Sequence, residues 1–250
     1  MRNKIIVLGA SSGIGQATAE RFAREGWQVL ITGVEPALTQ TVLASLPGEG
    51  HQAQVLDVSS EAAIEQLGQF VQQQFGPFDA LVNCIGISQS VPVIGSDFEH
   101  WDRPLQVMLY GSVHLCRRLV PWLKDGGRLI HITSIHHDRV AFGSSAYGMA
   151  KAALTQLTRA LAVELASRRI LVNAIAPGFV QTPMSVKADG RNELETEWFY
   201  DNYIRYDHLP LKRAGQPQEI AGVAWFLAGP DASYMTGSVL TVDGGLLITF

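Results

Sequence analysis

Tyr147 and Lys151 are the residues in this sequence whose types and spacing point most directly to chemistry. They lie four positions apart, so on a helix they share one face. A tyrosine hydroxyl titrates at about pH 10 in model peptides. An ammonium about 5 Å away favours tyrosinate by roughly 3 kcal/mol at an effective dielectric constant of about 20, which suits a general acid and base. Taken alone, the same spacing is also typical of a solvated helix face.

Ser134 directly follows an apolar run at 128–133 and stands upstream of Tyr147. Its hydroxyl can hold a substrate oxygen beside the tyrosine hydroxyl, although a single serine at a strand end is usually an ordinary loop residue. The three side chains together are far more specific than any one of them.

A glycine-rich run, Gly9-Ala-Ser-Ser-Gly13-Ile-Gly15, lies between a predicted strand and a predicted helix. A tight turn there favours residues without Cβ, and the free N–H groups of a helix N-terminus bind pyrophosphate. The glycine spacing differs from the G-x-G-x-x-G dinucleotide fingerprint. An ordinary glycine-rich turn is therefore the alternative interpretation.

The elements that must position these residues alternate along the chain. Short apolar runs predict strands at 4–8, 28–32, 54–56, 80–82, 128–133, 171–174 and 238–242. Helical patterns predict helices at 14–25, from Pro36, after Ser60, and at 102–123, 145–167 and 217–228. This alternation predicts an α/β fold, a doubly wound parallel sheet with helices on both faces. Its ligand site is expected at the carboxyl ends of the strands, where the candidate residues fall.

Composition excludes several other classes of protein. Of 250 residues, 47% are hydrophobic and 17% are charged, which excludes a disordered chain, and no linker or repeat divides the sequence. The net charge of −4 argues against a nucleic-acid or membrane partner. The apolar stretch 170–186 contains Asn173 and Pro177 and does not suit a membrane span. Without a signal-peptide pattern or a disulfide framework, we expect a cytoplasmic protein.

The glycine loop, Ser134, Tyr147 and Lys151 together resemble the short-chain dehydrogenase/reductase family in its single-domain form, over the whole chain. The resemblance implies a Rossmann-like fold and reversible hydride transfer between a nicotinamide cofactor and a secondary alcohol or ketone. It makes Tyr147 the acid/base and lets Ser134 orient the carbonyl. Lys151 would bind the nicotinamide ribose and lower the pKa of Tyr147.

The same resemblance supplies cofactor-binding positions. Asp57 would bind the adenine amino group, Asn83 and Gly86 belong to the turn after the fourth strand, and 177–182 would close over the nicotinamide. The positions assigned to the cofactor are Gly9, Ser11, Ser12, Gly13, Ile14, Gly15, Gly33, Asp57, Val58, Asn83, Gly86, Tyr147, Lys151, Pro177, Gly178, Val180 and Thr182.

Three residues depart from the family pattern. Leu8 replaces a threonine, which we expect to be tolerated, and Ile85 replaces an alanine, which we expect to crowd the cofactor cleft slightly. Met108 stands where the family has an asparagine that holds a proton-relay water, largely through its main-chain carbonyl. Methionine keeps that carbonyl and loses the amide.

Cofactor choice depends on the end of the second predicted strand. Members that use NAD often have an aspartate at the place of Gly33, and members that use NADP often have a cation at the place of Val34 or Ser12. This chain has neither, and Glu35 would repel a 2′-phosphate. We therefore expect NAD, with NADP as the alternative.

The expected substrate site contains Ser134, Tyr147 and His136. The neighbouring pair His136 and His137 does not predict a metal site, because no further ligands converge in the sequence. Segment 187–210, rich in aromatic residues, matches the family's mobile substrate lid within a single domain 1–250. Similarity to glucose and sugar-alcohol dehydrogenases favours a sugar or polyol as the small-molecule substrate.

Two alternatives stay open, a 3-oxoacyl reductase and a non-catalytic nucleotide-binding redox sensor. The first would require a basic docking patch such as Arg117, Arg118, Arg168 and Arg169. Symmetric closure is the rule for soluble oligomers, so we also expect a homo-oligomer, a tetramer or dimer. The resemblance to the family implies pairing through helices 102–123 and 145–167. The apolar tail 246–250 would dock on a neighbouring subunit.

Overall fold

A single parallel sheet organises the chain in the computed structural model, which describes residues 2–187 and 189–249. The strand order is β3-β2-β1-β4-β5-β6-β7, and every neighbouring pair is parallel. The strands are β1 (Lys4–Leu8), β2 (Gln28–Gly33), β3 (Gln52–Val55), β4 (Phe78–Asn83), β5 (Leu123–Ile132), β6 (Leu171–Pro177) and β7 (Val239–Val242). The order reverses between β1 and β4, and such a switch point opens a crevice at the carboxyl ends of the strands.

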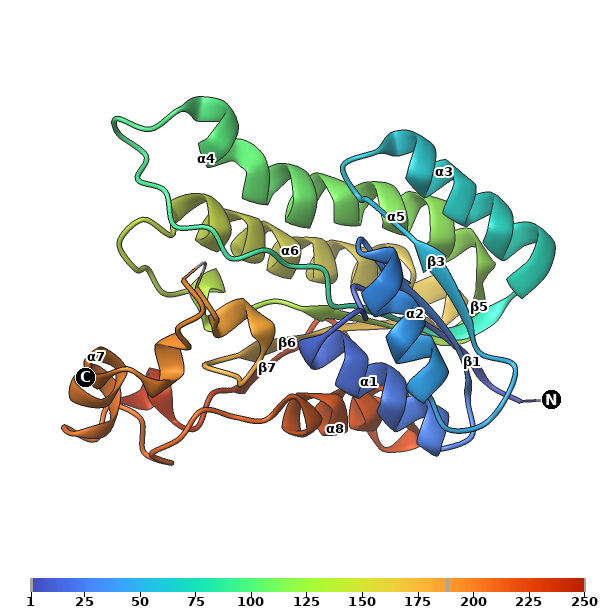
Figure 1. Ribbon diagram of the computed structural model, residues 1–250. Coiled ribbons are helices and arrows are strands. Elements are labelled where there is room, and N and C mark those ends of the chain that lie inside the picture. Colours follow the sequence, from blue (N-terminus) through green and yellow to red (C-terminus); the bar gives the residue numbers. More distant parts are fainter. Residues whose placement is uncertain (1, 188, 250) are drawn as a thin grey trace.

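Helices cover both faces of this sheet (Figure 1). They are α1 (Gly13–Arg24), α2 (Pro36–Ser45), α3 (Glu61–Phe70), α4 (Phe98–Pro104), α5 (Gly111–Leu119), α6 (Ser145–Glu164), α7 (Glu197–Phe199) and α8 (Pro217–Ala228). Alternate strand residues point to opposite faces. Ile5 and Val7 accordingly pack in the core with α1 and α8, whereas Ile6 and Leu8 pack in the core with α3 and α5. The doubly wound α/β prediction is confirmed.

Three predicted elements differ most from the structure, and one of them, the strand expected at 128–133, already begins at Leu123. The third strand, expected at 54–56, occupies Gln52–Val55, because it is an edge strand whose polar residues give a weak pattern. The helix expected at 102–123 is a longer helical region in which a π-helical turn, Leu105–Tyr110, separates α4 from α5. Pro104 has no N–H to donate within this helix, and the His100 carbonyl instead accepts a hydrogen bond from the Gln89 side chain.

Segment 183–212 forms a separate small layer beyond the carboxyl ends of the strands (Figure 1). It contains short helical turns and its own apolar cluster, in which Leu194, Phe199 and Leu209 are buried. Leu246 of the tail packs on this cluster, and the Thr249 hydroxyl donates to the His208 carbonyl. The tail is thus partly covered by its own chain, while Ile248 is exposed and Phe250 lies outside the described residues. None of the described helices is both long and apolar enough to cross a membrane.

Candidate active site

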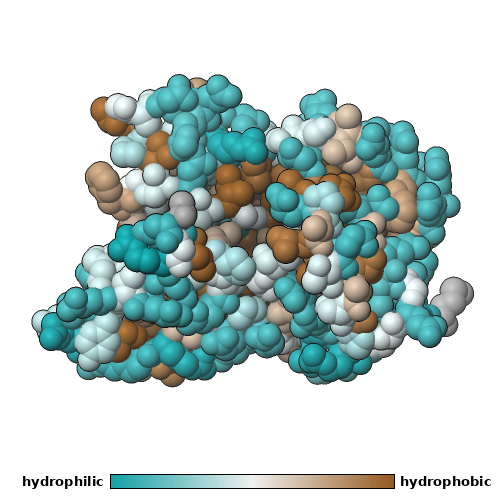
Figure 2. Space-filling model, viewed as in Figure 1, coloured by the Kyte–Doolittle hydropathy of each residue, from teal (hydrophilic) through white to brown (hydrophobic). Residues whose placement is uncertain are grey.

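A cavity of about 410 Å³ opens at the carboxyl ends of the strands, where Figure 2 shows apolar side chains gathered in a central hollow. It contains every predicted cofactor-binding residue except Asn83. The predicted residues that line it are Gly9, Ser11, Ser12, Gly13, Ile14, Gly15, Gly33, Asp57, Val58, Gly86, Ser134, Tyr147, Lys151, Pro177, Gly178, Val180 and Thr182. The fold therefore brings together residues that lie far apart in the sequence.

The glycine loop has the geometry of a phosphate cradle. Gly9 has φ +71°, a conformation that favours glycine, and α1 begins at Gly13 with free N–H groups. A Cβ on Gly15 would lie 2.1 Å from the Gly9 carbonyl oxygen, so this close approach of loop and helix requires glycine. Helix N-termini of this kind bind pyrophosphate. The loop thus fits a dinucleotide, although its spacing differs from the commoner fingerprint.

The far end of the cavity has the polar features that an adenosine group requires. Asp57 follows β3, and two hydrogen bonds from Ser59 lower the pKa of its carboxyl, with a smaller contribution from Arg103. Arg103 lines the same cavity. From the sequence we expected no cation near a 2′-phosphate of the cofactor. The structure brings Arg103 of α4 to the cavity, and no local sequence pattern shows that this helix reaches it. At Gly33 a Cβ would lie 2.4 Å from the Thr39 hydroxyl, so an aspartate would not fit without rearrangement.

Ser134, Tyr147 and Lys151 meet at the opposite end of the cavity. Ser134 follows β5, and its hydroxyl accepts a hydrogen bond from the His136 N–H at 3.2 Å. Tyr147 and Lys151 are on consecutive turns of α6, and the Lys151 ammonium lies 5.7 Å from the centre of the tyrosine ring. Lys151 Nζ also donates to the Ile132 carbonyl at 2.9 Å. The solvated-face alternative is wrong, because Lys151 is 3% exposed.

The electrostatics of this pair differ from our expectation. Burial raises the pKa of Tyr147, and the Ser134 hydroxyl lowers it only in part. Burial also lowers the pKa of Lys151 to about 8. The predicted lowering of the tyrosine pKa by lysine is therefore absent in the protein alone, because desolvation was not visible in the sequence. At neutral pH Tyr147 is a protonated acid, ready to donate to a carbonyl oxygen.

Two predicted residues lie beside the cavity and not on its wall. Asn83 is buried, with its amide donating to the Ser112 hydroxyl at 2.8 Å and its carbonyl accepting from the Ile85 N–H at 3.1 Å. It fixes the turn that carries Gly86. The His136 ring packs edge-on against Tyr147, with ring centroids 5.5 Å apart, and its Nδ1 atom is buried without a hydrogen-bond partner. Burial lowers the pKa of this histidine.

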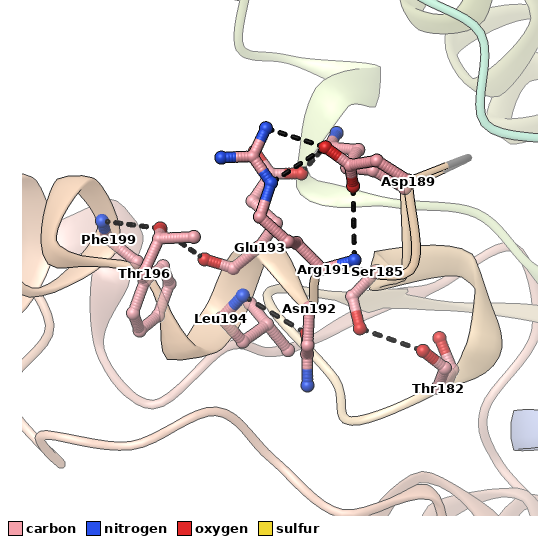
Figure 3. A network of polar contacts seen from close by, with 10 residues as sticks. Thr182, Ser185, Asp189, Arg191, Asn192, Glu193, Leu194, Thr196 and Phe199 are labelled. Atoms are coloured by element: carbon pink, nitrogen blue, oxygen red, sulfur yellow. Dashed lines mark hydrogen bonds and ion pairs between the residues drawn. The ribbon is translucent and has the colours of Figure 1, made fainter.

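Segment 182–194 contributes lining residues that the sequence did not identify. Met184, Ser185, Glu193 and Leu194 line the cavity, and the Met184 methyl lies 3.4 Å from the place of a Cβ on Gly86. The segment thus crosses the cavity from the glycine loop to the β4 turn. Its polar side chains mostly bond within the segment (Figure 3). Only contacts made by the folded chain reveal this role.

The fold and the site together define a nicotinamide-dependent oxidoreductase of the Rossmann type. Residues 9–247 match a family described as enoyl-(acyl carrier protein) reductase. The chain is 34% identical to 3-oxoacyl-[acyl-carrier-protein] reductase FabG of Thermotoga maritima, covering 97% of each chain. It is 34% identical to glucose 1-dehydrogenase of Gluconobacter oxydans, over 98% of this chain and 92% of that protein.

Solved structures support the same family assignment. A short-chain dehydrogenase/reductase from Serratia marcescens superposes with a TM-score of 0.86 at 32% identity, covering 98% of this chain and 97% of that chain. The chain belongs to the short-chain dehydrogenase/reductase family, and it is an oxidoreductase that uses a nicotinamide cofactor.

Proposed function

We propose that this oxidoreductase transfers a hydride reversibly between NAD and a secondary alcohol or ketone, with Ser134, Tyr147 and Lys151 as its catalytic residues. The observation that carries the proposal is the convergence of these three side chains at one end of a cavity whose other end is a phosphate cradle. The nicotinamide supplies and accepts the hydride. Tyr147 donates a proton to the carbonyl oxygen during reduction and takes it back during oxidation. Ser134 holds that oxygen by a hydrogen bond.

Lys151 holds its ammonium beside Tyr147 and stabilises the tyrosinate that forms when the proton leaves. Its hydrogen bond to the Ile132 carbonyl, at 2.9 Å, supports this role because it holds the ammonium at the end of β5. Asn83 acts as a positioning residue, since it touches the turn and not the cavity.

The choice of NAD is supported by the residues after β2. Val34 lines the cavity with an apolar side chain, and the exposed Glu35 beside it repels a 2′-phosphate. Arg103 is on the Asp57 side, where its charge acts on that carboxyl. We also propose that residues 1–250 form one domain, with 187–210 as the substrate lid.

A cytoplasmic homotetramer or dimer is the assembly that we propose. Met149 and Val163 on α6 and Tyr110 just before α5 are half or more exposed, on the helices that we expect to pair. A reducing compartment suits the free thiols of Cys84 and Cys116.

The 3-oxoacyl reductase alternative keeps the same catalytic chemistry. Of the arginines that could dock an acidic carrier, Arg118 pairs with Glu65 and Arg168 pairs with Asp125. These ion pairs favour a structural role for both arginines.

The test is the Tyr147→Phe variant, measured with NADH and NADPH against a panel of ketones, polyols and an acyl thioester. We expect kcat to fall by about 10²–10⁴-fold, because only the hydroxyl can move the proton. Cofactor affinity should stay within about threefold of the wild-type value, since the ring remains. A matched Tyr234→Phe variant, at an exposed tyrosine outside the cavity, should keep full activity. A Tyr147→Phe enzyme with more than a tenth of the wild-type kcat would show that another group is the acid. A wild-type protein that binds NADH but reduces nothing in the panel would favour the sensor.

A further inference from the structure

We propose that the substrate carries an extended apolar arm, such as an alkyl or aryl group several carbons long, that lies on a rim outside the cavity. This inference rests on the proposed function and narrows its substrate class. It favours an apolar ketone or its alcohol over a sugar or polyol.

The rim consists of four large apolar side chains on two loops. Val93 and Ile94 are 57% and 88% exposed on the loop between β4 and α4, and Val140 and Phe142 are 93% and 92% exposed on the loop between β5 and α6. We call these four residues the apolar rim. Large apolar side chains that are this exposed and are grouped on two neighbouring loops are typical of a surface where something binds.

The apolar rim is continuous with the catalytic end of the cavity. One loop leaves the cavity wall after Ile87, and the other leaves it after Ser134. The two loops are joined by a hydrogen bond from the Val91 N–H to the Gly143 carbonyl, at 2.7 Å. In Figure 1 both loops extend beyond the carboxyl ends of the strands on the same side as the lid, and Figure 2 shows apolar side chains on that margin.

The cavity wall next to the rim is also apolar. Ile87, Met184 and Leu194 line it, and the Met184 methyl and Lys151 Nζ approach the same point beside Gly86, within 3.4 Å and 3.7 Å. The apolar part of the wall thus begins beside Lys151, at the end of the cavity from which both rim loops leave. A substrate with its carbonyl at Tyr147 would place an alkyl chain against this wall, and a longer chain would reach the rim.

Most polar side chains near this end are engaged within the protein, and the exception among the described residues is the buried Nδ1 atom of His136 beside Tyr147. The Ser185 hydroxyl donates to the Thr182 carbonyl at 2.7 Å (Figure 3), and Glu193 forms an ion pair with Lys187. The Thr133 hydroxyl donates to the Ile175 carbonyl at 3.0 Å. A sugar presents a hydroxyl on nearly every carbon, and each one that loses water without a new partner weakens binding. Ser134 and Tyr147 suffice for one oxygen, which is what a simple ketone has.

The experiment measures binding of 2-butanone, 2-hexanone and 2-octanone by calorimetry to the protein loaded with NAD⁺, which cannot reduce a ketone. In parallel, kcat/KM is measured for reduction of the same three ketones with NADH. We expect affinity and kcat/KM to rise about fourfold for each added methylene, until the rim is covered. Glucose and ribitol should bind at least tenfold more weakly than 2-octanone.

A double variant, Ile94→Ser with Phe142→Ser, should bind and reduce 2-butanone as the wild type does but lose most of the dependence on chain length. The matched control is Leu38→Ser, which removes an exposed leucine of α2 outside the rim and the cavity and should keep that dependence. A wild-type series without chain-length dependence would overturn the proposal, as would tighter binding of glucose. Dissociation of an oligomer by the double variant, seen in sedimentation, would assign the rim to a second copy instead. Chain-length-dependent binding without any reduction would retain the rim and reject the proposed function.

Discussion

The side-chain ammonium of Lys151 donates a 2.9 Å hydrogen bond to the main-chain carbonyl of Ile132, two residues before Ser134. This contact ties α6 to the end of β5 and fixes the distance between the acid/base pair and the serine. It also holds a charge in a buried position, and burial lowers the pKa of Lys151 to about 8. The catalytic arrangement therefore has a cost in stability.

We predict that Lys151→Met raises the free energy of unfolding by about 1–2 kcal/mol at pH 7 while removing turnover, because an apolar chain of similar length replaces a buried charge. In the wild type the loss of stability caused by burying the charged lysine is at its full value below pH 8. This loss declines between pH 8 and 10.5, the ordinary pKa of lysine, because Lys151 loses its proton at a lower pH in the folded state than in the unfolded state. Urea titrations at pH 7 and 9.5 should therefore show the advantage of the variant shrinking. An advantage that grows with pH would contradict this account.

The sequence was sufficient to predict the sheet and to select Ser134, Tyr147 and Lys151, which the structure places on one cavity, because their signals are local. Buried strands have continuous apolar runs, and Tyr147 and Lys151 share one helix. The lining roles of Met184 and Arg103 depend on where a lid and a helix come to rest, which no local pattern encodes. The pKa of Tyr147 was expected to fall and instead rises, since burial depends on the whole fold.

Cofactor preference should change when the charge after β2 is reversed. We predict that Val34→Arg with Glu35→Ser raises the ratio of kcat/KM for NADP over NAD at least about tenfold. The reason is that an arginine guanidinium donates paired hydrogen bonds to a phosphate group. Glu35 is the N-cap of α2 and makes no side-chain cap there, so serine should not lower stability. A charge-matched control makes the same change in net charge at exposed residues outside the cavity, Gln73→Arg with Glu49→Ser. A wild-type enzyme that already prefers NADP would refute the charge argument.

His131 makes the fold sensitive to acid. It is buried in β5, where its Nδ1 contacts the Thr158 hydroxyl at 2.9 Å and its Nε2 lies 3.7 Å from Cys116 Sγ. These two contacts connect the strand to α6 and to α5. Burial lowers its pKa from 6.5 to about 3. Between about pH 6.5 and 3 this histidine binds a proton in the unfolded chain but not in the folded chain. The free energy of unfolding therefore falls as the pH decreases through this range.

We predict that His131→Leu removes about 1.4 kcal/mol per pH unit from the slope of stability between pH 6 and 4. The measurement is urea unfolding at several pH values in that range. Because the ring of His100 is exposed, the His100→Leu variant is the control and should keep the wild-type slope. An unchanged slope in His131→Leu would mean that the acid sensitivity has another source.

Met108 is the departure from the family that bears most directly on turnover, and the structure shows what its main chain does. Its side chain is fully buried, and its carbonyl accepts a 2.6 Å hydrogen bond from the Ser112 hydroxyl, which in turn accepts from the Asn83 amide. The carbonyl is thus held in place without any help from a side-chain amide. Met108 Sδ lies 3.9 Å from the place of a Cβ on Gly86, in apolar surroundings close to Lys151.

We predict that Met108→Asn leaves kcat within about threefold of wild type, because the relay depends on the carbonyl, which asparagine also has. The exchange should lower the free energy of unfolding by about 1–3 kcal/mol, since a polar amide replaces a buried thioether. Leu38→Asn is the control: it puts asparagine in place of an exposed apolar residue of α2, so it includes the helix-propensity cost but little loss of burial. Stability by urea unfolding and kcat with the best ketone should be measured on all three proteins. A gain of tenfold or more in kcat would show that the natural enzyme works with an impaired proton relay, and that the missing amide is the reason.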